Sequence, residues 1–318
     1  MEQLLGLAPH AQDPALFIET RWVVGANWFN MGEFVPAREY MEQGIAFYDP
    51  RQHRHYAILF GMDPGVLFRT YISHVLWHLG YPGQALSMSH EALTLAQELS
   101  HPFSIATALD YAAMLHQFRH EEHPAREWAE AAIALCTEQG FAYYLGWATI
   151  IRGWALTAQG QGEEGLGQMR QGLAALRATG GEIRLPYYLA LLAEAHGKAG
   201  QAEAGLTLLA EALAQSYNTG EHWWEAELYR LQGELLLALP ADKPAGAETC
   251  FHQALDIARR QQAKALELRA AMSLSRLWQH QGKQAEARAL LVPVYGWFTE
   301  GFDTADLQEA KALLDALA

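Results

Sequence analysis

The chain has 318 residues, of which 51% are apolar and 18% are charged, and its formal net charge is −14. This charge argues against binding to nucleic acid, which needs clustered Lys and Arg, and against binding to anionic membranes. No apolar run approaches the roughly 18 residues of a membrane span, and no signal peptide is visible after Met1. Two cysteines, Cys136 and Cys250, need no disulfide, so we expect a cytoplasmic protein.

Small residues recur along the sequence with a period of about 40 residues. Each copy has a turn position, usually glycine, with one small residue seven positions earlier and another five positions later. Small residues let two antiparallel helices approach closely, and glycine ends a helix with a positive φ at no steric cost. The pattern therefore predicts an all-α solenoid of about seven helix pairs. The seven turn positions are Gly32, Gly80, His120, Gly160, Gly200, Pro240 and Gly282.

At the N-terminal end, residues 2–8 are typical of the last turns of a helix. We therefore expect residues 1–12 to end a preceding repeat, in a chain cut from a longer protein or started at an internal Met. Asp13 before Pro14 predicts a helix N-terminus, and the first repeat extends to about Tyr48. Residues 49–65 are an insertion, either a functional loop or, as we favour, a longer turn packed on the neighbouring repeat.

The later repeats vary around the same pattern. The third has His120 in place of the turn glycine, the fourth and fifth are the most regular, and the sixth has extra residues in 239–246. Thr304 is predicted to cap a last amphipathic helix, residues 305–317, that covers the open end of the stack. We thus expect a repeat array over residues 13–303 and a C-terminal capping helix within residues 304–318.

The repeats resemble the tetratricopeptide repeat, lengthened from its usual 34 or so residues, over roughly residues 13–300. Five further runs are Asp49-Pro50-Arg51-Gln52-His53, Asp63-Pro64-Gly65, Leu79-Gly80-Tyr81-Pro82, His222-Trp223-Trp224-Glu225-Ala226-Glu227-Leu228 and Pro293-Val294-Tyr295-Gly296-Trp297-Phe298-Thr299-Glu300-Gly301-Phe302-Asp303-Thr304. These runs are similar to the C-terminal repeat region of bacterial fusion proteins that carry a class III adenylate/guanylate cyclase domain and an AAA-type signalling ATPase domain. The resemblance implies a right-handed superhelix, with the first helix of each repeat on its concave side, and a regulatory role. The cyclase and ATPase parts do not lie in these residues, so their chemistry is not implied.

Motifs that could indicate chemistry lack their required context. Residues 160–165 spell GxGxxG, but a predicted helix rather than a strand precedes them. His120 and His123 lack the spacing of a zinc-protease motif, and His53 and His55 would face different sides of a helix, so we interpret all four as solvated loop histidines. No P-loop, GxSxG elbow or partnered Cys/His nucleophile is found. We predict no catalytic residue, cofactor or metal.

The candidate binding residues lie on the first helix of each repeat, at registers expected to face the concave groove. They are aromatic in the N-terminal half and Arg or Glu in the C-terminal half. Aromatic residues and Arg dominate binding hot spots, so such a groove suits a peptide, a partner helix or a flat ligand. Alternatively, the tryptophans only fill the inner curve of the superhelix. The candidates are Trp22, Phe29, His74, Trp77, Asp110, Trp147, Trp154, Tyr187, Glu194, Arg230, Glu234, Arg269 and Arg276.

These features favour a non-catalytic array that binds a peptide, a partner protein or a small effector in its groove. A structural oligomerisation module is an alternative. An enzyme is least favoured, because its side chains would come from separate repeats. Such an enzyme would use His74, Asp110, Glu194, Arg230 and Arg276.

Overall fold

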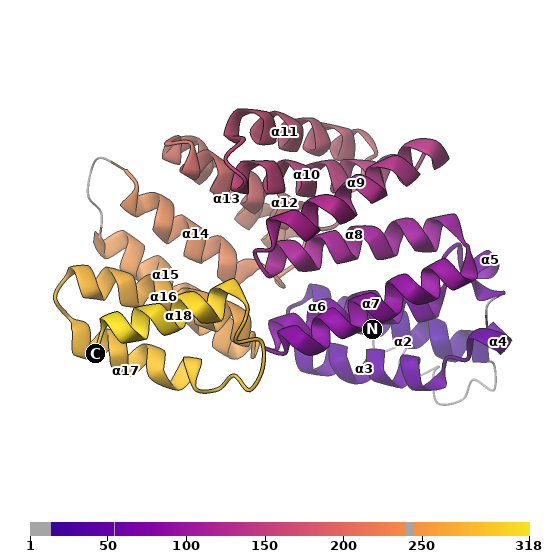
Figure 1. Cartoon of the computed structure of the whole chain (residues 1–318), viewed down its shortest axis with the longest axis horizontal. Helices are drawn as coiled ribbons and strands as arrows, with labels where there is room; N and C mark the ends of the chain where they lie inside the picture. The colour runs from indigo at the N-terminus through magenta and orange to yellow at the C-terminus, as the bar shows by residue number, and fades with distance from the viewer. Residues whose placement is uncertain (1–13, 54, 240–243) are drawn as a thin grey trace.

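A computed structural model describes residues 14–53, 55–239 and 244–318, and all their regular elements are helices (Figure 1). Seven antiparallel helix pairs form a right-handed α-solenoid, which confirms the predicted fold. The first helices of the pairs are α2 (Pro14–Asn30), α6 (Pro64–His78), α8 (Pro102–Phe118), α10 (Ala142–Ala158), α12 (Leu185–Lys198), α14 (Glu225–Leu237) and α16 (Lys264–His280). The second helices are α3 (Phe34–Phe47), α7 (Pro82–Leu99), α9 (Glu122–Gln139), α11 (Gly162–Ala178), α13 (Ala202–Thr219), α15 (Pro244–Arg260) and α17 (Gln284–Tyr295).

The turns within the pairs have the backbone conformation that their glycines predicted. All six described turn positions have a positive φ, from 56° at His120 to 88° at Gly80. A Cβ at Gly160 or Gly200 would meet no atom within 4 Å, so glycine is favoured here by the positive φ of the turn and not by close packing. The seventh turn position, Pro240, and the helix end expected in residues 2–8 lie outside the described residues.

The small residues inside the pairs allow the backbones to touch. A Cβ on Gly153 would lie 2.7 Å from the Gly165 carbonyl oxygen, and a Cβ on Gly165 would lie 2.5 Å from the Gly153 carbonyl oxygen. Ala193 and Gly233, at the same register as Gly153, are also buried. Larger side chains here would force the paired helices apart.

The insertion forms two short helices, α4 (Pro50–His53) and α5 (Tyr56–Phe60), and its end packs on the next repeats. The fully buried Asp63 carboxylate accepts hydrogen bonds from the Tyr48 hydroxyl (2.8 Å) and the Val66 N–H (3.0 Å). The Asp63 N–H donates to the Ser104 hydroxyl on α8 at 3.0 Å. The favoured interpretation of the insertion as a packed turn agrees with these contacts.

The prediction of solvated histidines in this insertion is wrong for His53. Its ring is 7% exposed and stacks on the rings of Phe47 and Tyr56, while its Nδ1 accepts the Asp49 N–H at 3.0 Å. His55 is exposed, as expected. The aromatic neighbours shield His53 because α4 folds back onto the end of α3.

The last helix, α18 (Ala305–Ala316), packs on α16 and α17, as predicted for a capping helix. Thr304 occupies the N-cap position, but its hydroxyl donates to the Gly301 carbonyl (2.6 Å) and makes no cap bond to the helix. Thr304 is therefore the N-cap residue, as predicted, although its side chain makes no capping hydrogen bond.

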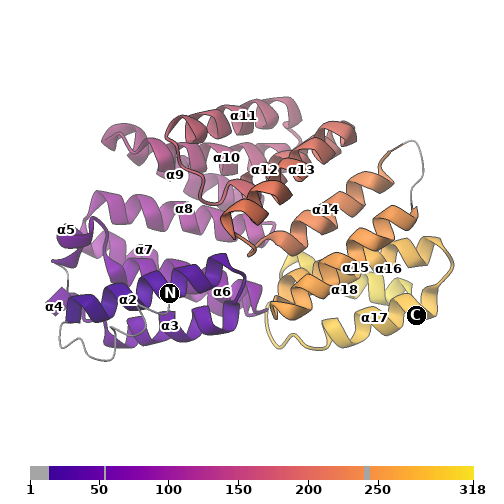
Figure 2. The same cartoon turned by 180° about the vertical axis from the view of Figure 1, so that it is seen from behind.

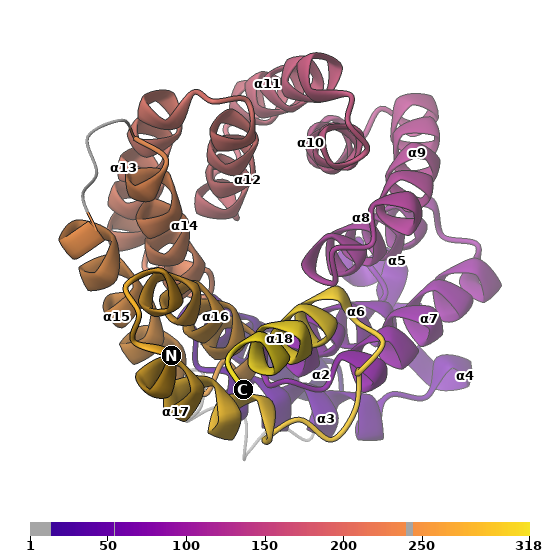
Figure 3. The same cartoon turned by 60° about the vertical axis from the view of Figure 1, so that its left-hand side comes forward.

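The superhelix closes on itself, which the repeat pattern did not predict (Figures 2 and 3). At the end of α2, the Asn30 carbonyl accepts the N–H groups of His222 (2.7 Å) and Trp223 (3.2 Å) from the turn before α14. We call this contact between residues 30–32 and 220–223 the seam. A second closing contact joins the Glu300 carboxylate to the N–H groups of Gly83 (2.9 Å) and Gln84 (3.0 Å) at the start of α7.

Candidate functional site

The aromatic half of the predicted groove is a closed interior. Rings of the early repeats pack on Trp223 and Trp224, which the seam brings to them. The ring centroids of Phe29 and Trp223 are 5.3 Å apart, and those of Phe118 and Trp224 are 5.1 Å apart. Residues separated by nearly 200 positions therefore form one aromatic interior.

The predicted site residues differ in how far they are exposed. Trp22 is half-buried, and four residues on the later repeats stay partly exposed: Glu194, Arg230, Glu234 and Arg276. The expectation of exposed inner registers is wrong for the other eight. Phe29 and Trp77 are covered by Trp223 and Trp224 across the seam. His74 and Trp154 instead pack on Tyr111 and His120 of neighbouring repeats. The buried eight, each at most 4% exposed, are Phe29, His74, Trp77, Asp110, Trp147, Trp154, Tyr187 and Arg269.

Two of the buried residues are polar and have pKa values shifted by burial. Burial lowers the pKa of His74 well below its usual value, and the His74 Nε2 lies 3.0 Å from the Tyr111 carbonyl oxygen. Burial raises the pKa of Asp110 well above its usual value, and neither carboxylate oxygen has a hydrogen-bond partner among the described residues. Both side chains therefore favour their neutral forms, which suits an interior position.

Arg184 is the central cation of this interior, and sequence reasoning missed it. Its side chain is 1% exposed, and its guanidinium donates to the Tyr111 hydroxyl at 2.8 Å. The guanidinium carbon lies 5.2 Å from the ring centroids of both Trp147 and Trp223, within cation–π range. Arg184 lies just before α12, outside the helical registers, so the repeat pattern gave no signal for it.

The accessible part of the inner side is charged, and we call it the polar wall. It comprises Glu194 and Lys198 on α12, Arg230 and Glu234 on α14, and Arg276 on α16. In this order, each of these three helices contacts the next (Figure 3). Exposed fractions of these side chains range from 15% for Arg230 to 53% for Lys198. The C-terminal candidates of the predicted groove are thus brought together in space.

A buried carboxylate below the wall holds Arg230 in place. Glu227, 6% exposed, accepts two hydrogen bonds from Arg230, at 2.7 and 2.9 Å, and lies 3.8 Å from Arg269. Burial alone would raise the pKa of Glu227, but the charge and hydrogen bonds of Arg230 outweigh it and lower the pKa to about 2. Arg269 in turn binds Asp306 on α18 at 2.9 Å, which links the wall to the capping helix.

The wall has a cavity of about 300 Å³ between α12 and α14. Glu194 pairs with Lys198 at 2.7 Å on one side, and Arg230 contacts Glu234 at 3.3 Å on the other. Leu231 and Leu235 complete the lining with apolar surface. Both signs of charge and an apolar floor can recognise a polar chain such as a peptide.

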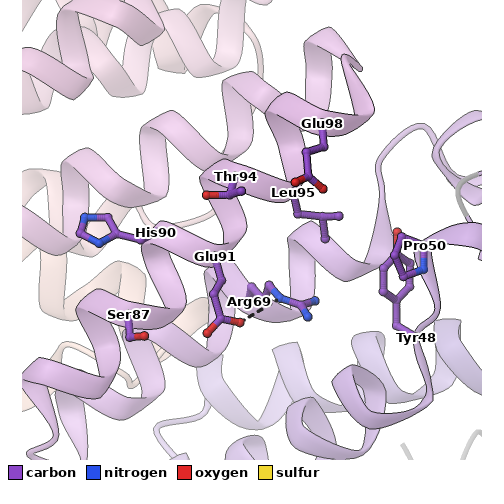
Figure 4. Close-up of a pocket in the computed structure, with 9 residues that line it drawn as sticks. All are labelled: Tyr48, Pro50, Arg69, Ser87, His90, Glu91, Thr94, Leu95 and Glu98. Carbon is purple, nitrogen blue, oxygen red and sulfur yellow. Dashed lines mark ion pairs between the residues drawn. The ribbon is translucent and has the colours of Figure 1, made fainter.

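A second cavity, of about 390 Å³, lies on the outer helix α7, beside the end of α3 and the insertion. In Figure 4 Arg69 reaches toward Glu91, with Nε and Oε2 3.5 Å apart, and Glu98 lies above them. Arg69 also donates to the Gly65 carbonyl at 3.1 Å. This cavity is separate from the inner registers.

Two further features bear on function. No helix among the described residues is long and apolar enough to cross a membrane. Within that same part of the chain, no group of three His, Cys, Asp or Glu side chains is arranged to hold a metal ion.

No known family model matches the chain. An uncharacterised protein of Rhizobium meliloti (strain 1021) is 25% identical over 268 residues, which cover 84% of this chain. The match covers only 26% of that relative, so the chain spans about a quarter of its length.

Solved structures share the fold at low identity. NprR in complex with its cognate peptide NprX has a TM-score of 0.59 at 13% identity, with 94% of this chain and 82% of that chain covered. A Rap protein complexed with competence and sporulation factor has a TM-score of 0.58 at 10% identity, with 96% and 98% covered. A signal transduction ATPase of Pyrococcus horikoshii with a tetratricopeptide repeat sensor has a TM-score of 0.50 at 12% identity, with 98% and 48% covered. These likenesses support a tetratricopeptide-like solenoid.

Proposed function

We propose that the chain is a non-catalytic sensing array that binds a peptide, or an extended segment of a partner protein, along the polar wall. The observation that carries the proposal is the wall itself. The aromatic registers are buried, yet Glu194, Arg230 and Glu234 line a 300 Å³ cavity, and Arg276 stays partly exposed on α16 beside α14. The peptide in the NprR complex supports this choice of ligand, because that protein shares the fold.

The charges of the wall suit a ligand that carries both acidic and basic side chains. Arg276 and Glu309 pair at 2.8 Å, with 43% and 56% of their side chains exposed. A charged side chain of a ligand can therefore replace either partner with little loss of free energy. Arg230 is more firmly held, by Glu227 below it, and offers a fixed cation. A fixed cation with exchangeable pairs around it favours binding with defined orientation.

We further propose that the array is the regulatory part of a bacterial signalling ATPase or cyclase. The chain matches about a quarter of its Rhizobium relative, and it covers about half of an ATPase that carries a repeat sensor. Both proportions suit an array joined to a larger output module. An in-phase reading frame for a nucleotide-binding module upstream of Met1 would support this context, and a stop codon directly upstream would contradict it.

Selection from a random displayed peptide library tests the binding proposal. We expect selected peptides to lose about tenfold or more in affinity for Arg276→Ala and for Glu234→Ala. The matched control is Arg38→Ala, which breaks a similar exposed Arg–Glu pair on the outer helix α3. Failure to select any peptide, or equal affinity for all three variants, would contradict the proposal.

A further inference from the structure

A larger cavity, of about 570 Å³, lies at the seam and is separate from the polar wall; we call it the seam pocket. Figure 2 shows the end of α2 next to the turns that precede α12 and α14. Three distant parts of the chain thus meet around one space. The lining residues are Asn27 and Asn30 from α2, Met31 just after it, Glu182 and Ile183 before α12, Thr219 at the end of α13, and Gly220, Glu221 and His222 before α14.

The two charged side chains of the lining are both carboxylates. Glu221 is 7% exposed and is fixed by the Arg184 N–H, which lies 3.0 and 3.1 Å from its two oxygens. Glu182 is exposed, and one of its oxygens accepts from the Gln215 side chain at 3.4 Å. The Arg184 guanidinium, the cation of this turn, points into the aromatic interior toward Tyr111.

The backbone adds to this negative character. Helices α2 (Pro14–Asn30) and α13 (Ala202–Thr219) both end at the seam pocket. The C-terminal end of a helix carries a partial negative charge and favours a cation. The two helix ends and the two carboxylates therefore all favour a cation in the seam pocket.

The lining also holds an unused acceptor. The Asn30 side-chain oxygen is buried and has no hydrogen-bond partner among the described residues. The Asn30 backbone carbonyl is already occupied by two N–H groups across the seam. A buried acceptor without a donor is unfavourable, so a ligand that carries N–H donors favours a turn of the Asn30 side chain that brings this oxygen to the surface of the pocket.

The rim of the pocket is apolar. Met31 is 44% exposed and Ile183 is 57% exposed, and both line the cavity. Alkyl carbons of a ligand can contact these side chains while its charged end points inward. We propose that the seam pocket binds a primary alkylammonium group, supplied by a free amine or by a lysine side chain of a partner.

Such a ligand would contact both sides of the seam. Asn27, Asn30 and Met31 belong to the first repeat, whereas the two carboxylates belong to turns of the later repeats. A ligand that binds the closed ring and not an open one stabilises closure by mass action. The site thus couples the presence of an amine to the shape of the array.

Isothermal titration of the full chain with n-pentylammonium at millimolar concentration tests the proposal. n-Pentanol and pentanoate serve as matched probes without charge and with the opposite charge. Nα-acetyl-lysine amide and a short lysine-containing peptide distinguish a free amine from a lysine side chain. The variant Glu182→Gln removes an exposed carboxylate, and Glu203→Gln, an exposed glutamate on α13 outside the pocket, is its control.

We expect saturable binding of n-pentylammonium at one site, weakened about tenfold by Glu182→Gln and unchanged by Glu203→Gln. Neither pentanol nor pentanoate should bind, and the unfolding temperature should rise with the amine alone. Absence of saturable binding, equal binding by pentanol, or equal binding to both variants would overturn the proposal. Tighter binding of the lysine probes than of n-pentylammonium identifies a partner's lysine as the source, and the reverse order identifies a free amine.

Discussion

The aromatic interior and the polar wall occupy the same registers of the same type of helix, yet only one of them is open. Trp77 and Trp154 are buried at 3% and 4% exposure, whereas the side chains of Glu234 and Arg276 are 40% and 43% exposed. For Trp77 the difference comes from closure, because Trp224 across the seam stacks on its ring with the centroids 6.1 Å apart. Trp154 is covered by its own neighbourhood, where its ring stacks on His120 of the preceding repeat. Register tells which residues face inward, and the path of the whole superhelix decides which of them a ligand can reach.

The two regions should also differ in what they contribute to stability. The interior gains from burying large rings, each worth several kcal/mol. The ion pairs of the wall are partly exposed and contribute about 0–1 kcal/mol each. Mutations in the two regions therefore separate packing from binding.

The largest effect is expected for Trp223→Ala in the aromatic interior. Trp223 is 1% exposed and contacts Phe29 from across the seam. Removing its ring should lower the free energy of unfolding by about 3–5 kcal/mol, measured by urea denaturation. The control Ile58→Ala, at 85% exposure, should change it by less than about 0.5 kcal/mol. Similar small losses for both variants would show that the interior is not packed as described.

A comparable loss, of about 3 kcal/mol at neutral pH, is expected for Glu227→Gln, because the buried Arg269 and the partly exposed Arg230 lose the carboxylate they share. The pKa of Glu227 is lowered to about 2 in the folded protein from its usual 4.5. Its stabilising effect is therefore complete above pH 4.5 and is lost as the pH falls toward 2. Urea denaturation of wild type and variant across this range should show the two stabilities converging. A gap that is independent of pH would contradict the role assigned to this carboxylate.

Smaller effects on stability, of opposite sign, are expected for alanine substitutions at two glycines of the fourth repeat. Gly153→Ala should destabilise by about 1–3 kcal/mol, because the new methyl group meets the Gly165 carbonyl. A Cβ at Gly167, within α11, would meet no atom within 4 Å. Gly167→Ala should therefore stabilise by up to about 1 kcal/mol. Thermal unfolding that shifts in the same direction for both variants would argue against close helix contact at Gly153.

The smallest effect on stability is expected for Arg276→Ala on the polar wall. Its ion pair with Glu309 is exposed, so the loss should be within about 0.5 kcal/mol. The same variant is expected to weaken peptide binding strongly. A stability loss comparable to that of Trp223→Ala would assign the wall to the structural core.

Much of the fold could be predicted because its cause is local. Gly153, Gly160 and their counterparts recur at fixed distances, and each acts on the turn or the helix next to it. The seam could not be predicted, because the bonds from His222 and Trp223 to Asn30 join residues almost 200 positions apart without any repeated signal. The burial of Phe29 and Trp77 depends on that closure, so register alone could not predict which candidate residues a ligand can reach.

The seam is the central claim, and hydrogen exchange at its two donors tests it most directly. The N–H groups of His222 and Trp223 lie in a turn, yet both bond to the Asn30 carbonyl across the seam. The closed ring predicts that these two amide hydrogens exchange much more slowly than those of Glu182 and Ile183, in the corresponding turn before α12. Equally fast exchange at all four residues would indicate an open superhelix and would contradict the account.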